Sequence, residues 1–168
     1  MGTRRSILFV CSGNICRSPL AEAVLREKLR ERGLAERYVV DSAGTVTDHL
    51  GQQSDARMRR TAARNGVVID HRARRVERTD MKEFDLVIGM DEWHMSALRS
   101  LADGEPVEIR KMREFDPEVN APTGESRAPD VPDPWYGGME GFERVYEMVD
   151  RSCEVLADRL AREAAEDS

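Results

Sequence analysis

The first apolar run of this chain leads through a short polar loop directly into an amphipathic segment. Ile7–Val10 has the length and the β-branched and aromatic content of a buried strand. The loop that follows runs from Cys11 to Arg17. Ser18 and Pro19 are typical of a helix cap and a first helical residue. We expect an apolar stripe on this helix, formed by Ala21, Val24, Leu25 and Leu29. A strand, a tight loop and a helix in this order favour an α/β fold with the loop at a helix N-terminus.

The spacing C-x5-R places a nucleophile and a fixed positive charge in one loop. Loop N–H groups and the positive end of the helix stabilise a Cys11 thiolate and also bind phosphoryl oxygens. Arg17 offers a planar fork that grips two such oxygens. We expect Gly13 to let the backbone turn with its amides facing inward. The expected cradle for a phosphate group comprises Ser12, Gly13, Asn14, Ile15, Cys16 and Ser18.

Far downstream, one carboxylate stands on a turn beside two aromatic residues. Asp133 precedes Pro134, which restricts the backbone there, and Trp135 and Tyr136 follow. Transfer of a phosphoryl group from an ester needs an acid that protonates the departing oxygen, and a fixed Asp is suited to this. We therefore expect Asp133 to be the acid and the two aromatic residues to line the substrate pocket. Asp130 is the nearest alternative acid.

At this point the chain resembles the low-molecular-weight protein tyrosine phosphatase family over nearly its whole length. The segment from Cys11 to Pro19 is similar to the family's phosphate loop, and Ala21-Glu22-Ala23 follows it as in the family. The other similar segments occur in the family's order: Val40-Asp41-Ser42-Ala43-Gly44-Thr45, Asp55-x-Arg57, His71-x-Ala73-Arg74, Met90-Asp91-Glu92, Phe115-Asp116-Pro117 and Asp133-Pro134-Trp135-Tyr136-Gly137.

The resemblance implies hydrolysis in two steps through a phosphocysteine. Cys11 would attack the phosphate, Arg17 would hold its equatorial oxygens, and Asp133 would act first as acid and then as base. A hydrogen-bond network would support the loop, and Cys16 would trap oxidised Cys11 as a disulfide. The implied substrates are phosphotyrosine proteins, with phosphate or vanadate as inhibitors. The implied network residues are Asn14, Ser18, Ser42 and His71.

Three alternatives remain open. A protein arginine phosphatase of the same fold differs mainly in the leaving group, and that branch has a threonine where this chain has Ile15. A thioredoxin-coupled arsenate reductase needs two further cysteines near the middle of the chain, and none lies between Cys16 and Cys153. A phosphoprotein-binding or redox-sensing module would not need the acid, so the presence of Asp133 argues against it.

The hydrophobic pattern predicts one domain across all 168 residues, with the last few residues frayed. Strand candidates alternate with amphipathic segments, which indicates a parallel sheet with right-handed crossovers. The resemblance implies a flavodoxin-like three-layer fold with strand order 2-1-3-4. The longest irregular stretch, residues 116–134, is expected to carry the acid. The predicted strands are residues 7–10, 39–41, 86–90 and 107–109, and the predicted helices are 19–32, 54–65, 91–102 and 141–160.

Composition narrows the functional classes further. A net charge of −6 argues against a general nucleic-acid binder, and no apolar run is long enough to cross a membrane. No cluster of metal ligands is visible in the sequence, so we expect neither a metal nor another cofactor. Three cysteines without a secretory signal favour a reducing, cytoplasmic location without structural disulfides. Of these, Cys153 is expected to pack inside the last helix.

Two features lie outside these motifs. Asp48 stands where family members commonly carry an aromatic residue at the entrance of the cleft, so the wall of the cleft is open to question. A region rich in arginine is interpreted as solvated surface, with attraction of phosphorylated substrates as the alternative. Its arginines are Arg57, Arg59, Arg60, Arg64, Arg72, Arg74, Arg75 and Arg78.

Overall fold

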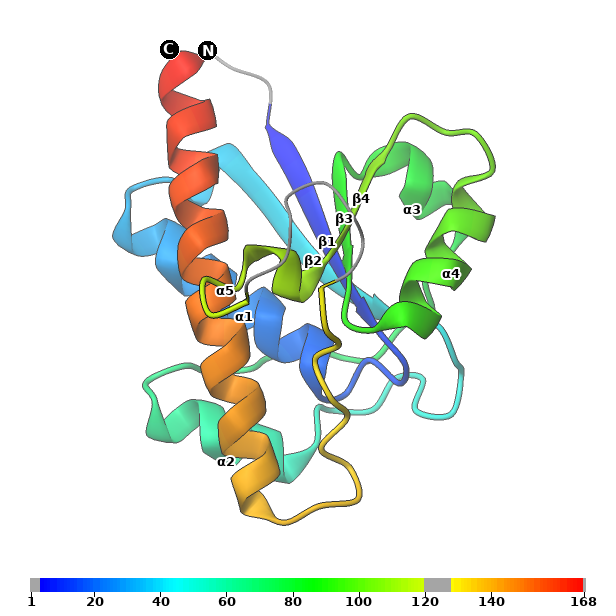
Figure 1. The fold of residues 1–168 in the computed structure, drawn as a ribbon, viewed down its shortest axis with the longest axis vertical. Coiled ribbons are helices and arrows are strands. Elements are labelled where there is room, and N and C mark those ends of the chain that lie inside the picture. The colour runs from blue at the N-terminus through cyan, green and yellow to red at the C-terminus, as the bar shows by residue number, and fades with distance from the viewer. Residues whose placement is uncertain (1–3, 120–127, 168) are drawn as a thin grey trace.

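The computed structural model describes residues 4–119 and 128–167 and contains one parallel sheet with helices on both sides (Figure 1). Its four strands are arranged in the order β2-β1-β3-β4, which confirms the predicted order. All three pairs of neighbouring strands are parallel. The strands are β1 (Arg5–Cys11), β2 (Tyr38–Gly44), β3 (Leu86–Gly89) and β4 (Glu108–Lys111).

The helices agree with the predicted alternation but differ from it in detail. A short helix, α3, precedes β3 and was not predicted, and the last helix is longer than expected. The last helix continues to Glu166, into the stretch that was expected to fray. Ser168, the final residue of that stretch, lies outside the described residues. The helices are α1 (Arg17–Glu31), α2 (Ala56–Arg64), α3 (Arg78–Glu83), α4 (Glu92–Ala102) and α5 (Met139–Glu166), with 3-10 turns η1 (Ala35–Arg37) and η2 (Met112–Phe115).

The expected cap of α1 was wrong. The helix begins at Arg17 with Cys16 as its N-cap, and no side chain caps it. Ser18 lies inside the first turn, where its hydroxyl contacts the sulfur of Cys11 at 2.9 Å instead of a backbone N–H. The hydroxyl is therefore used by the nucleophile and not by the helix end. In contrast, Asp55 does cap α2, since its carboxylate accepts the N–H groups of Arg57 and Met58.

Alternation along β1 separates two apolar cores. Ile7 and Phe9 pack into the core shared with α1 and α5, whereas Leu8 and Val10 pack into the core shared with α3 and α4. Successive residues of a strand point to opposite faces, so a central strand buried on both faces is apolar throughout. Figure 1 shows the resulting three layers, with α1, α2 and α5 on one side of the sheet and α3 and α4 on the other.

Because the strands are parallel, the loops that follow them meet at the same edge of the sheet. The segment after β1 approaches the end of β2 so closely that a Cβ on Gly44 would lie 2.5 Å from the carbonyl oxygen of Ser12. The N–H of Thr45 then donates to the carbonyl of Cys11 at 3.0 Å. A glycine at position 44 is thus required for the loop after β1 to close against β2.

The irregular stretch between η2 and α5 is described only in part, since residues 120–127 lie outside the described residues. Its later part returns to the sheet edge, where the N–H of Val131 donates to the carbonyl of Met90 at 2.8 Å. This contact brings the segment that contains Asp133 to the loops after β1 and β3. Among residues 4–119 and 128–167, no helix combines the length and apolar character needed to cross a bilayer.

Candidate active site

The loop between β1 and α1 turns at Asn14, not at Gly13. Asn14 has a φ of 58°, in the left-handed region. The φ of Gly13 is not positive. The expectation that Gly13 supplies the turn was therefore wrong. The need for glycine there is steric, because a Cβ on Gly13 would lie 2.9 Å from Cδ2 of His49.

The side chain of Asn14 uses all four of its hydrogen-bonding positions. Its Nδ2 donates to the hydroxyl oxygens of Ser18 at 2.9 Å and Ser42 at 3.0 Å. Its Oδ1 accepts from Nε2 of His71 at 2.7 Å and from the N–H of Arg74 at 2.9 Å. Because Asn14 is 1% exposed, this set holds its unusual backbone conformation without competition from water. The structure thus brings the four expected network residues together.

The hydrogen of the Ser18 hydroxyl is directed by the same network. The oxygen accepts from Asn14, so the O–H can donate to Sγ of Cys11 at 2.9 Å or to the more distant carbonyl of Ala43 at 3.4 Å. A hydroxyl that donates to sulfur is an arrangement that can stabilise a thiolate. Cys11 is 2% exposed and its sulfur lies at the base of a cleft of about 200 Å³.

Arg17 joins the cradle to two other segments. Its Nη1 donates to Oδ2 of Asp91 at 3.0 Å and to the carbonyl of Val131 at 2.9 Å. Its Nη2 lies 3.7 Å from Oδ2 of Asp133. The guanidinium is 2% exposed, so its orientation is fixed by these partners. One edge is held by protein, and the Nη2 edge faces the carboxylate expected to be the acid.

Asp133 and Asp130 occupy different surroundings. Asp133 lines the cleft that holds Cys11, and its side chain is half-exposed. Its Oδ1 accepts the N–H of Trp135 at 3.0 Å, which orients the carboxylate. Asp130 does not line this cleft and pairs with Nζ of Lys111 at 2.6 Å. The geometry therefore favours Asp133 over Asp130 as the proton donor.

The wall of the cleft contains an aromatic residue that the sequence interpretation missed. Asp48 is exposed and lines the cleft, and the next residue, His49, lines it as well, with its ring centroid 5.6 Å from that of Trp135. Tyr136 also lines the cleft but is 95% exposed. The ring expected at position 48 is thus replaced by an imidazole one residue later.

Arg57 fixes the segment that follows the acid. Its Nη1 donates to the carbonyl of Trp135 at 3.2 Å, and its guanidinium lies over the Trp135 ring at 5.3 Å. Asp55 holds the same guanidinium through Nη2 at 3.0 Å. Asp55 in turn donates its own N–H to the carbonyl of Ile15 at 2.7 Å. The phosphate loop and the acid segment are therefore linked through the start of α2.

Among the described residues, four of the eight arginines in the arginine-rich region form ion pairs. Arg57, Arg64, Arg74 and Arg78 each pair with a carboxylate. Arg74 is anchored most firmly, because Asp41 and Asp80 both lie 3.0 Å from its Nη2. The four paired arginines are therefore part of the protein's surface structure, which favours the interpretation as surface over the attraction of substrates for these four.

A second group missed by sequence reasoning is His94 on α4. It is 1% exposed, and its Nδ1 accepts the N–H of Asp91 at 3.1 Å. The proton of the neutral ring therefore resides on Nε2, which donates to the hydroxyl of Ser12 at 2.9 Å. Burial lowers the pKa of His94 to about 4, so the ring is neutral at physiological pH. Asp91 and His94 thus hold Arg17 and Ser12 from the same helix end.

The two remaining cysteines have different environments. Burial, together with the charge of Cys11, raises the pKa of the Cys16 thiol well above its usual value. Cys153 is fully buried in α5, where its sulfur contacts the carbonyl of Ala21 at 3.9 Å. All three cysteines are free thiols.

Comparisons with known proteins agree with this geometry. The family described as low molecular weight phosphotyrosine protein phosphatase matches residues 6–166. A low molecular weight protein-tyrosine-phosphatase of Streptomyces coelicolor is 43% identical over 146 residues, or 86% of each chain. The crystal structure of a protein tyrosine phosphatase from Entamoeba histolytica is 37% identical, with a TM-score of 0.83, and the match covers 95% of this chain and 99% of that one. A Drosophila arginine phosphatase is 29% identical, with a TM-score of 0.80 and coverage of 92% and 96%.

The neutral state of buried His94 predicts a pH dependence of stability. Its pKa in the folded protein, about 4, lies below the value of about 6.5 expected in the unfolded chain. Between these values the unfolded state binds the extra proton, so His94 destabilises the fold as pH falls, by up to about 1.4 kcal/mol per pH unit. Urea unfolding from pH 7 to pH 4 should show a smaller loss of stability for His94→Gln than for the parent.

Ser12→Ala is the matched control, because it removes the hydrogen-bond partner of His94 and keeps the buried imidazole. It should retain the parental pH slope. If His94→Gln and the parent lose stability equally over this range, His94 is not buried in its neutral form.

Proposed function

The chain belongs to the low molecular weight phosphotyrosine protein phosphatase family, a family of hydrolases, and we propose that it dephosphorylates protein tyrosine through a phosphocysteine on Cys11. One observation carries the mechanism. The sulfur of Cys11, with the Ser18 hydroxyl directed at it, shares one cleft with Arg17 and with the carboxylate of Asp133. Nucleophile, anion clamp and acid are then within reach of one phosphate group.

In the first step the Cys11 thiolate attacks phosphorus while the bond to the tyrosine oxygen breaks. Backbone N–H groups of the loop and the Nη2 edge of Arg17 hold the equatorial oxygens. Asp133 protonates the departing oxygen, which would otherwise leave as a basic phenolate. The side chain of Asp133 is half-exposed, so both the departing oxygen and the later water can reach its carboxyl group.

In the second step water displaces the sulfur from phosphorus. The Asp133 carboxylate, which lost its proton in the first step, takes a proton from this water. The leaving group is now the Cys11 thiolate, and the Ser18 hydroxyl at 2.9 Å stabilises it as it departs. Phosphate is released from the cradle, so phosphate and its analogue vanadate are expected inhibitors.

The lining of the cleft supports phosphotyrosine as the substrate. Ile15, His49, Trp135 and Tyr136 present one aliphatic and three ring side chains around the phosphate cradle. Such a wall packs against an aromatic leaving group. The Entamoeba enzyme holds Hepes, a sulfonate, in its active site, which supports the same kind of oxyanion cradle here. The Drosophila relative keeps arginine phosphatase as the second candidate, and Ile15 in place of threonine argues for tyrosine.

The proposed mechanism includes protection by Cys16. Peroxide would convert the Cys11 thiolate to a sulfenic acid, and the Cys16 thiol would displace water from it to form a disulfide. Burial chiefly, and the neighbouring Cys11 in addition, raise the pKa of Cys16, so Cys16 is present as a thiol beside Cys11. Cys153 is fully buried in α5, which argues against the electron relay of an arsenate reductase. Free thiols in all three cysteines also support a reducing, cytoplasmic compartment.

The function is tested with a panel of peptides that carry phosphotyrosine, phosphoarginine or phosphoserine. We expect the highest kcat/KM for the phosphotyrosine peptide. The Cys11→Ser variant should turn over none of the peptides. That variant should still bind phosphate, measured by calorimetry, because Arg17 and the loop amides remain. A higher kcat/KM for phosphoarginine would assign the chain to the second candidate, and turnover by Cys11→Ser would contradict the mechanism.

Removal of the acid should depend on the leaving group. Asp133→Asn is expected to lower kcat/KM by about 10²–10⁴-fold for phosphotyrosine, because this leaving oxygen needs a proton. The loss should be smaller for p-nitrophenyl phosphate, whose leaving group is less basic. Asp130→Asn is the matched control and should leave this difference between substrates unchanged. Equal losses on both substrates would show that Asp133 is not the acid.

Mild peroxide should inactivate the enzyme reversibly. We expect thiol reductant to restore the parent more completely than Cys16→Ser, because only the parent forms the protective disulfide. Mass spectrometry of the oxidised parent should show a bond between Cys11 and Cys16. Cys153→Ser is the control and should recover like the parent. Equal recovery of Cys16→Ser and parent would remove the protective role of Cys16.

A further inference from the structure

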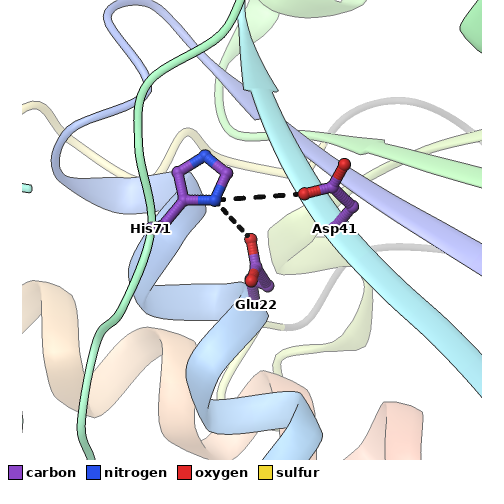
Figure 2. A group of neighbouring side chains, drawn as sticks. All are labelled: Glu22, Asp41 and His71. Carbon is purple, nitrogen blue, oxygen red and sulfur yellow. Dashed lines mark ion pairs between the residues drawn. The ribbon is translucent and has the colours of Figure 1, made fainter. Parts of the chain in front are cut away.

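Three side chains from separate elements converge behind the phosphate loop (Figure 2). Glu22 comes from α1, Asp41 from β2 and His71 from the segment before α3. Nδ1 of His71 lies 3.2 Å from Oε1 of Glu22 and 3.9 Å from Oδ1 of Asp41. One donor atom from each residue lies within 4.8 Å of the other two. Widely separated positions in the sequence hid this group from the motif analysis.

The tautomer of His71 is fixed by Asn14. Nε2 of His71 lies 2.7 Å from Oδ1 of Asn14, an oxygen that only accepts hydrogen bonds. Nε2 must therefore carry a proton and donate it. In the neutral ring this leaves a lone pair on Nδ1, which faces two carboxylate oxygens. Burial raises the pKa of Glu22 to about 7. The group can therefore share either a proton or, once that proton is lost, a metal ion.

The separations fit a tetrahedral transition-metal ion. Zn–N and Zn–O bonds of about 2.0–2.2 Å place neighbouring ligand atoms about 3.4 Å apart. The observed distances from Nδ1, 3.2 and 3.9 Å, lie within about 0.5 Å of this value. A nitrogen ligand beside two carboxylates favours zinc over magnesium, which prefers oxygen alone.

The outer oxygens of both carboxylates are held by arginines. Oε2 of Glu22 pairs with Nη1 of Arg26 at 2.8 Å, and Oδ2 of Asp41 pairs with Nη2 of Arg74 at 3.0 Å. The other oxygen of each carboxylate lies toward His71, and Oε1 of Glu22 also accepts the hydroxyl of Ser42 at 2.7 Å. The donation from Nε2 to Asn14 completes an arrangement typical of metal sites, in which the second ring nitrogen of a ligating histidine is itself hydrogen-bonded.

A path from solvent leads to this group. A cavity of about 570 Å³, larger than the cleft at Cys11, is lined by Glu22 and His71 together with Arg26, Glu27 and Tyr38 among others. Its location between α1, β2 and the segment before His71 separates it from the substrate cleft. Ligand atoms, supporting contacts and an entry path are thus all present.

We propose that Glu22, Asp41 and His71 bind one divalent ion of the zinc class, with water as the fourth ligand. The ion occupies the position between Nδ1 and the two inner carboxylate oxygens. It takes no part in phosphoryl transfer, since the group lies behind the phosphate loop and outside the cleft. Its effect reaches the loop through the bond from His71 to Asn14, so an occupied site steadies the cradle.

The test measures Zn²⁺ binding to the full chain with Cys11→Ser and Cys16→Ser, because free thiols also bind zinc. Calorimetry should detect one equivalent of Zn²⁺, and Mg²⁺ should bind far more weakly. In this background Glu22→Gln and Asp41→Asn should each weaken the affinity at least about tenfold. Zn²⁺ should also raise the Tm of the chain that carries only Cys11→Ser and Cys16→Ser, because the ion binds only the folded state.

Glu27→Gln is the matched control. Glu27 lies on the same helix and lines the same cavity, but it pairs with Arg30 and not with His71. It should keep the affinity and the rise in Tm. If Glu22→Gln fails to fold, the test rests on Asp41→Asn alone. Asp41 is partly exposed, so its replacement should not prevent folding. Absence of a bound equivalent, or equal affinity of parent and Asp41→Asn, overturns the proposal and leaves a proton shared between Glu22 and Nδ1 of His71 in place of the metal ion.

Discussion

The active site depends on one buried amide. Asn14 adopts a backbone conformation that a non-glycine residue rarely takes, and its side chain is held by four hydrogen bonds from three other segments of the chain. Ser18 supplies one partner from α1, Ser42 one from β2, and the segment around His71 two. A loop held in this way is fixed before substrate binds, so in the proposed mechanism its N–H groups bind the phosphate with little reorganisation.

The end of α4 holds the same loop from the other side. Asp91 and His94 form a reciprocal cap of this helix, and each also contacts the loop, through Arg17 and Ser12 respectively. The neutral tautomer of His94 follows from its acceptance of a backbone N–H, so the imidazole can only donate to Ser12. A helix cap, normally a local stabilising device, here also orients two residues of the phosphate cradle.

Local sequence was sufficient for those features that lie close together along the chain. The strand, loop and helix that contain Cys11 and Arg17 were predicted from their neighbours, Asp133 was predicted from its turn beside two aromatic residues, and the resemblance supplied the strand order. The missed contributions come from contacts across long sequence separations. His94 is 82 residues from Ser12, and His49 is recognised as a cleft residue only when Trp135 is in place beside it. The turn at Asn14 was missed because glycine is the default residue for that conformation and Gly13 is adjacent. Here side-chain hydrogen bonds, which no local pattern reveals, offset the backbone strain.

The acid and the anion clamp share an anchor, and this affects how variants are interpreted. Nη1 of Arg17 donates to the carbonyl of Val131, whose own N–H donates to Met90 at the end of β3. Asp133 stands two residues after Val131, so the guanidinium that we propose holds phosphate also positions the segment that carries the proposed acid. A shorter side chain at Arg17 would release both functions together. Its effect on rate is therefore expected to exceed the loss of phosphate affinity, because the transition state uses the clamp and the acid at the same moment.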